Sequence, residues 1–234
     1  ESGIYYLNIK TKHSNTRKIS IMPISTTHPT TQETITANVA GAAVVISPRY
    51  GESYSFDRSG RLIGLFVDGT SYQRAFDGRF IIRRSKQRIP LPDDEIPALL
   101  TYAFDDLHAL AQVMPDLNIP TRDRDLLTMA LARALVFDPE RLDADAAQFR
   151  ALYKPVSILP PDLYLALVLQ ATEGCSWNRC TFCGLYRDRT FKIHSPDDFR
   201  EHCKAVRSFL GAGLSLRRGI FLADANALVI PQAR

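Results

Sequence analysis

Three of the four cysteines lie close together in the sequence, as Cys175, Cys180 and Cys183 with the spacing C-x4-C-x2-C, directly after an apolar run. Cysteines this near to one another can hold a metal ion or a cluster more easily than they can pair as disulfides. Three thiolates fill three corners of a four-coordinate metal or a four-iron cluster, and the fourth corner stays open to a substrate or cofactor. The spacing therefore predicts a redox cluster site.

The segments on either side of these cysteines predict one strand–helix–strand unit. Residues 164–170 are nearly all apolar, which is typical of a strand covered on both faces in a parallel sheet. Ser195 can cap a helix over residues 196–210, and residues 219–223 form a second strand. The cysteine loop and Asp224 both follow the carboxyl ends of strands, where α/β proteins place their sites.

The chain upstream predicts a separate organisation. Residues 1–36 are rich in Ser, Thr, Lys and Pro and are interpreted as an extended, partly disordered leader. After them, short apolar runs separated by turn signals such as Asp57–Arg61 predict a small antiparallel sheet. Apolar residues at three- and four-residue spacing then predict helices, at about 96–114, from Thr121 onward, and at 143–153. Acidic residues such as Asp105 and Asp106 are interpreted as solvated parts of these helices.

The predicted domains follow from these patterns. A proline-rich stretch over residues 155–161 separates an N-terminal accessory domain, β then α, over 37–158 from a second domain over 159–234. The fold class is therefore α/β, or α+β taken overall. We expect the second domain to hold only the beginning of a larger unit, so that the chain is part of an enzyme and inactive by itself.

Composition excludes several kinds of protein. The net charge of +4 is small and its basic residues are scattered, so a nucleic-acid partner is not indicated. No apolar run reaches the roughly 18–20 residues that span a membrane, and no secretory signal is recognisable. Clustered cysteines without a disulfide framework favour a reducing, cytoplasmic location.

The segment Leu165–Asn226 resembles the start of the core of a radical S-adenosylmethionine (radical SAM) enzyme. That family carries three cysteines on the loop after the first strand of a partial (β/α)6 barrel. The resemblance implies that Cys175, Cys180 and Cys183 ligate a 4Fe–4S cluster and that SAM binds the fourth iron. It also implies an electron donor such as a flavodoxin or ferredoxin, and cleavage of SAM to a 5′-deoxyadenosyl radical that abstracts hydrogen. The substrate is unknown.

The resemblance also assigns residues to the cofactor. Phe182, just before the third cysteine, matches an aromatic residue that lies beside the adenine in family members. The segment Ala223, Asp224, Ala225 and Asn226 matches a stretch near the SAM amino group, with Asp224 as the acceptor of a hydrogen bond, although the glycines that are frequent there are absent. The first cysteine gap is one residue longer than the commonest family spacing.

Basic residues after the cysteines offer a second kind of contact. Arg187, with Arg189 and Lys192, can hold the SAM carboxylate or an acidic group of the substrate, or can form a solvated basic loop.

A zinc site is the alternative. Cys203, or one of His194 and His202, would supply a fourth ligand, and the chain would be a non-catalytic, zinc-stabilised binding module. Cys203 lies on the apolar stripe of the predicted helix, where a cysteine more often acts as a small buried side chain.

Overall fold

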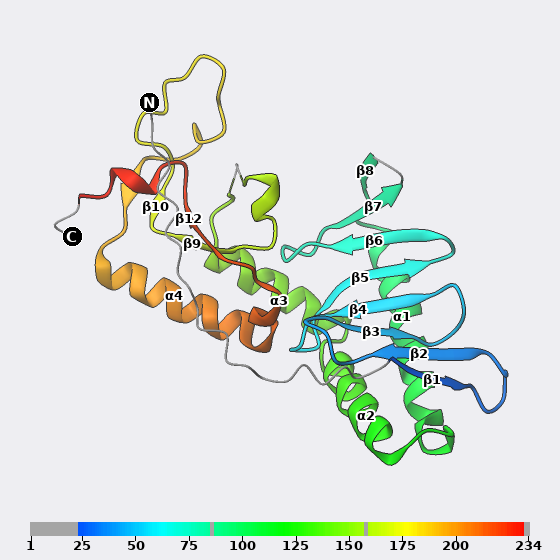
Figure 1. Ribbon diagram of the computed structural model, residues 1–234. Coiled ribbons are helices and arrows are strands. Elements are labelled where there is room, and N and C mark those ends of the chain that lie inside the picture. Colours follow the sequence, from blue (N-terminus) through cyan, green and yellow to red (C-terminus); the bar gives the residue numbers. More distant parts are fainter. Residues whose placement is uncertain (1–22, 85–86, 157–158, 232–234) are drawn as a thin grey trace.

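The computed structural model describes residues 23–84, 87–156 and 159–231. Its fold is mixed α/β, and an eight-stranded antiparallel sheet forms the larger part (Figure 1). The strands pair in chain order, so each neighbours the next along the sequence. They are β1 Ile24–Thr27, β2 Thr34–Asn38, β3 Val44–Ser47, β4 Ser53–Phe56, β5 Leu62–Val67, β6 Thr70–Arg74, β7 Phe80–Arg84 and β8 Gln87–Pro90.

Glycine at the turns of this sheet permits the tight connections that the sequence predicts. The turn between β4 and β5 contains Gly60, whose φ of +95° is strained for residues with a side chain. A Cβ atom there would lie 2.1 Å from the carbonyl oxygen of Arg133, so the turn touches the backbone of a helix. Gly60 thus lets the sheet and the helix approach each other closely.

Three helices follow the sheet in the chain: α1 Ile96–Val113, α2 Thr121–Val136 and α3 Pro139–Leu152. The main core lies between the sheet and these helices, with Ile46, Phe56, Leu107 and Leu127 at most 1% exposed. The first helix is confirmed as predicted. The expectation that Thr121 caps the second helix is wrong, because Thr121 is the first residue of α2 and Pro120 occupies the cap position. In the parts of the chain that the structure describes, no helix combines the length and the apolar character needed to cross a lipid bilayer.

The third helix begins four residues before the predicted start. Asp138 caps it, because its carboxylate accepts a hydrogen bond from the Arg141 N–H at 2.8 Å, and Pro139 occupies its first position. The Asp-Pro pair is the start signal, and the apolar spacing alone did not reveal it.

The predicted strand–helix–strand unit is present in the C-terminal part. Here β9 (Leu167–Gln170) pairs in parallel with β12 (Ile220–Ala223), and α4 (Pro196–Leu210) connects them. Ser195 caps α4 by accepting a hydrogen bond from the Asp198 N–H at 3.1 Å. The first strand is shorter than predicted, because a helical turn at Pro161–Leu163 occupies the segment before it.

Two further expectations about the sheets are wrong. Residues 24–27 and 34–36 belong to β1 and β2 rather than to an extended leader, since Ile24 and Ile35 are buried against the helices. Residues 1–22 of the expected leader lie outside the described residues. The strand predicted at residues 164–170 is not covered on both faces, because Leu167, Val168 and Leu169 of β9 are only partly buried.

Side chains occupy the edge of β9 that faces away from β12. The Tyr153 hydroxyl donates to the carbonyl oxygen of Val168 at 2.8 Å, and the Gln170 N–H donates to Nε2 of His202 at 3.1 Å. On the opposite side, β12 has no second strand beside it in the described parts of the chain.

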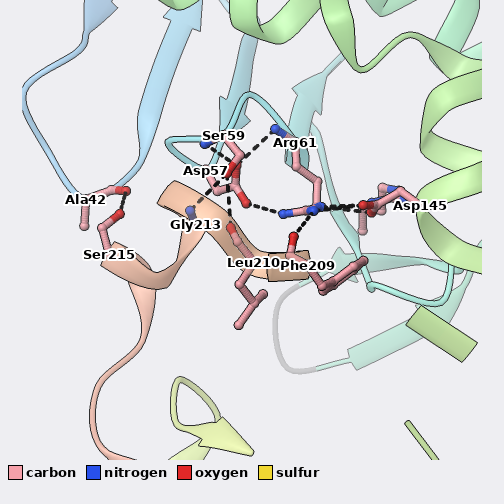
Figure 2. Close-up of polar contacts among 10 residues, drawn as sticks. Ala42, Asp57, Ser59, Arg61, Asp145, Phe209, Leu210, Gly213 and Ser215 are labelled. Carbon is pink, nitrogen blue, oxygen red and sulfur yellow. Dashed lines mark hydrogen bonds and ion pairs between the residues drawn. The ribbon is translucent and has the colours of Figure 1, made fainter. Parts of the chain in front are cut away.

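One buried arginine connects the two parts of the molecule (Figure 2). Arg61 is the last residue of the β4–β5 turn, directly before β5, and its side chain is buried, with the residue 2% exposed. Its Nη1 lies 2.8 Å from Oδ2 of Asp57. Its Nη2 lies 2.8 Å from Asp145 of α3 and also donates to the carbonyl oxygen of Phe209 in α4 at 2.9 Å. Arg61 therefore joins the sheet, α3 and the C-terminal end of α4.

Removal of this guanidinium is expected to destabilise the whole chain. Arg61→Ala leaves Asp57 and Asp145 buried without their main counter-charge, which typically costs about 3–5 kcal/mol. Arg79→Ala is the matched control, because it breaks an arginine–aspartate pair in which Arg79 is 78% exposed, worth at most about 1 kcal/mol. Urea unfolding of both variants measures the difference, and equal losses would contradict the role of Arg61.

Asp106 on α1 was expected to lie on a solvated face of the helix. It lies instead in a buried polar cluster. The Tyr54 hydroxyl donates to its carboxylate at 2.6 Å, and Arg49 forms an ion pair with it. Burial raises the pKa of Asp106, and nearby Glu52 acts in the same direction, whereas Tyr54 and Arg49 oppose the shift. Together these effects leave the pKa of Asp106 above its ordinary value.

This raised pKa predicts a pH dependence of stability. The folded state holds the Asp106 proton more tightly than the unfolded state, so the contribution to stability is present below about pH 4 and is lost as the pH rises through the raised pKa. Asp106→Asn removes this contribution, so the Tm of the variant minus that of the wild type should increase from about pH 4 to about pH 7. Asp105→Asn, at an exposed neighbouring position, is the matched control for the replacement of a carboxylate on α1. A Tm difference for Asp106→Asn that stays constant over this pH range would contradict the prediction.

Candidate functional site

A short antiparallel ladder closes the cysteine loop at its base. Strand β10 (Thr172–Glu173) pairs with β11 (Lys192–Ile193), so the loop of residues 174–191 leaves and returns at one point. The loop begins at Gly174, which follows the carboxyl end of β9 closely. The segment after β12 comes to the same place, because Asp224 contacts Gly174.

Gly174 meets two separate demands at this base. Its φ is +76°, and a Cβ atom would lie 3.3 Å from Cγ of Arg189 and 3.4 Å from the carbonyl oxygen of Thr190. The positive φ favours glycine over residues with a side chain. The short distances leave little room for a side chain, because residues 189 and 190 of the loop lie directly beside Gly174.

Substitution can separate these two demands. Gly219 has a similar φ of +80°, but a Cβ atom there would meet no other atom within 4 Å, so Gly219→Ala is subject to the conformational cost alone. That cost is about 1–2 kcal/mol. Gly174→Ala should destabilise the chain by more than Gly219→Ala in thermal or urea unfolding. An equal loss would show that the loop base is not crowded in solution.

All three loop cysteines are free thiols of intermediate exposure. Among the residues that the structure describes, no three or more His, Cys, Asp or Glu side chains are gathered so as to hold a metal ion. The donor set itself suits an iron–sulfur cluster, since it offers three accessible thiols on one loop.

Asn178 forms two hydrogen bonds within the cysteine loop. Its backbone N–H points at Sγ of Cys175 at 3.4 Å, and its side-chain amide donates to the carbonyl oxygen of Tyr186 at 2.9 Å. Asn178 has a φ of +46°, a conformation that asparagine tolerates better than most residues. Asn178 therefore connects the segment that begins at Cys175 to the backbone at Tyr186.

Asp224 lies buried beside the base of the loop. Its Oδ2 accepts a hydrogen bond from the Gly174 N–H at 3.1 Å and lies 3.6 Å from Nη1 of Arg189. Its backbone N–H donates to the Thr172 hydroxyl at 2.9 Å. Its other carboxylate oxygen, Oδ1, is buried and has no hydrogen-bond partner among the described residues. A buried acceptor without a donor is uncommon in proteins and calls for an explanation.

The surroundings of Asp224 set its protonation. Burial raises the pKa of its carboxyl group above the ordinary value, while the Gly174 N–H, the Tyr186 hydroxyl and the Arg189 charge act against this shift. Tyr186 is itself 2% exposed, and burial beside Asp224 raises its pKa to about 12. The Gly174 N–H and Arg189, both at Oδ2, therefore hold the carboxylate in place.

The other residues assigned by resemblance have varied surroundings. Phe182 is 90% exposed, so its ring is accessible to a ligand. Arg187 donates to the carbonyl oxygen of Cys180 at 3.1 Å, which ties it to the loop. Ala223 is buried and Ala225 is exposed. The side chain of Asn226 accepts a hydrogen bond from the Leu228 N–H at 3.2 Å, so it caps the turn that follows.

Tyr186 is the residue of this site that the sequence did not reveal. No motif or spacing distinguishes it from other aromatic residues on loops, and its role depends on a contact with Asp224 across the fold. Arg189 was grouped with Arg187 as a candidate for anion binding, but the structure brings only Arg189 to Asp224.

The candidate zinc ligands outside the loop are engaged elsewhere. Nε2 of His202 accepts the hydrogen bond from Gln170, and its ring packs edge-on against Tyr153 with centroids 5.4 Å apart. Cys203 lies on α4, where burial raises the pKa of its thiol. The His202 side chain therefore takes part in the packing of α4 against β9 and Tyr153.

Comparison of the chain with protein-family models, with curated proteins and with solved structures found no match.

Proposed function

We propose that this chain is part of a radical SAM enzyme, in which Cys175, Cys180 and Cys183 hold a 4Fe–4S cluster and Asp224 contacts SAM. When bound, the cluster supplies the electron that cleaves SAM to methionine and a 5′-deoxyadenosyl radical, the species that abstracts hydrogen from the unknown substrate. The observation that supports this proposal best is the buried Oδ1 of Asp224 at the base of the cysteine loop, which has no hydrogen-bond partner within residues 23–84, 87–156 and 159–231.

The unpaired oxygen suits an ammonium group. A buried carboxylate oxygen without a donor is unfavourable, and a ligand N–H or ammonium that binds it removes this cost. The methionyl amine of SAM is such a donor. Asp224 is held for this contact from its other side by the Gly174 N–H and by Arg189, so the ligand does not have to order the carboxylate.

Other residues of the loop have compatible roles in this proposal. The exposed ring of Phe182 can stack on the adenine, and Arg187 can direct its remaining N–H groups to the SAM carboxylate while one of them binds the Cys180 carbonyl. The Asn178 N–H stabilises the Cys175 sulfur as a thiolate ligand.

The proposal extends to the surroundings of the site. The parallel pair β9 and β12 would be the first two strands of a partial (β/α)6 barrel, with the cluster at its carboxyl edge. A reducing, cytoplasmic compartment suits the free cysteines, and a flavodoxin or ferredoxin would supply the electron.

Cluster content is the first test. Anaerobic reconstitution should yield about four irons and four sulfides per chain, as a 4Fe–4S cluster requires, and the EPR signal of the reduced protein should change when SAM is added. Cys175→Ala, Cys180→Ala or Cys183→Ala should each lower the iron content strongly, whereas Cys203→Ala should leave it unchanged. One tightly bound zinc that Cys203→Ala loosens would instead support the zinc-stabilised binding module.

Asp224→Asn tests the contact to SAM. The amide keeps an acceptor for the Gly174 N–H but loses the charge, so the affinity of the reconstituted protein for SAM should fall about 10-fold, the cost of a hydrogen bond to a charged group. Iron content and Tm serve as checks on the fold, and Asp197→Asn, at an exposed position, is the matched control. Unchanged SAM affinity in a cluster-loaded Asp224→Asn variant would exclude this contact.

A further inference from the structure

A cavity of about 610 Å³ lies at the end of β9 opposite to the cysteine loop. Residues that line it come from the turn after β6, from α3 and the segment that follows, from the start of β9 and from the end of α4. A second cavity of about 560 Å³ adjoins it over the face of the eight-stranded sheet. Both are lined by Phe76, Tyr164 and Arg217. Their volumes lie in the range of small-molecule sites.

Aromatic rings form one wall of the first cavity. The ring of Phe149 lies 5.4 Å from that of Phe76 and 5.0 Å from that of Tyr153, and Phe209 stands edge-on to Phe76 at 5.7 Å. Such a wall is suited to the apolar part of a ligand, and it holds its shape because the rings pack on one another.

Arg217 brings a positive charge to this wall. Its guanidinium lies 4.9 Å from the centroid of the Phe76 ring, and its Nε is buried without a hydrogen-bond partner among the described residues. Burial lowers the pKa of Arg217, and no carboxylate in the described ranges forms an ion pair with it. Arg61, on the same ring, differs in this respect because Asp57 and Asp145 bind it.

Further charges near the first cavity are mainly positive. Arg79, Arg150 and Lys154 line it together with a single acid among the described residues, Asp77. Asp77 is already paired with Arg79 at 2.6 Å, and Arg150 donates to the Asp77 carbonyl oxygen. The cavity therefore combines an apolar wall with an excess of positive charge.

We propose that this cavity binds a small organic anion, whose carboxylate or phosphate pairs with Arg217 and whose apolar body packs on Phe76, Phe149 and Tyr153. A guanidinium matches both kinds of oxyanion, and the pairing satisfies the buried Nε. The site is separate from the cysteine loop, because Arg217 precedes β12 and Asp224 follows it. The four residues of β12 span about 13 Å. The inference does not depend on the proposed radical SAM function.

Calorimetric titration with defined probes tests the proposal. The probes are 4-phenylbutyrate, phenyl phosphate and the uncharged 4-phenylbutan-1-ol, which present a similar ring with and without an oxyanion. At least one anion should bind at least about 10-fold more tightly than the alcohol, as expected for a charge-assisted hydrogen bond. The preferred anion distinguishes a carboxylate from a phosphate ligand.

Variants locate the binding. Arg217→Gln should weaken the preferred anion about 10-fold and leave the alcohol unchanged. Arg218→Gln, at the adjacent exposed arginine, is the matched control and should bind like the wild type. Arg217 forms no ion pair within the described parts of the chain but packs on the Phe76 ring, so the Tm of each variant is measured as a check on the fold.

Several results would overturn the proposal. These are equal affinity of the wild type for anions and alcohol, an anion affinity that Arg217→Gln does not change, and the absence of binding by both anions at millimolar concentration. If Arg217→Gln proves unstable, the comparison of anion with alcohol on the wild type still decides the question.

Discussion

The guanidinium of Arg61 is the contact on which the arrangement of this molecule depends. It lies where the β4–β5 turn, α3 and the end of α4 meet, and it binds a side chain or carbonyl of each. Ion pairs of this kind contribute less to net stability than their number of bonds suggests, because both charges lose their hydration. These bonds form only at particular distances and angles, however. The contacts of Arg61 therefore restrict how the C-terminal end of α4 is placed against the sheet and α3. Since α4 connects β9 to β12, the positions of both strands follow from it.

The parallel pair carries different chemistry at its two ends. At the carboxyl ends, the base of the loop that carries the free cysteines contacts a buried carboxylate, one oxygen of which has no partner among the described residues. At the amino ends, an arginine with a buried, unbonded Nε faces an aromatic wall. In both places a polar group is buried without a partner among the described residues, a cost that folding accepts where a ligand later satisfies it. The two features carry side chains of opposite charge, so the proposals made for them name ligand groups of opposite charge.

The sequence predicted those features that depend on local pattern. The helix cap at Ser195, the turn at Asp57–Arg61 and the strand–helix–strand order were recognisable because capping, turn geometry and periodicity act over a few residues. Asp106 and Tyr186 were misjudged or missed, because their burial depends on segments distant in the chain. Strand β1 was missed for a related reason: it is short and polar on one side, and only its pairing with β2 gives it order.

The side chains of Tyr153 and His202 have one more consequence for the small parallel sheet. Exposed strand edges present unpaired N–H and C=O groups that can recruit further strands. By binding the Val168 carbonyl and the Gln170 N–H, these two side chains use groups on the outer side of β9 that a neighbouring strand would need. The sheet can therefore grow in one direction only, beyond β12. A strand added there would also lie against Ile220 and Leu222 and shield their apolar surface from water.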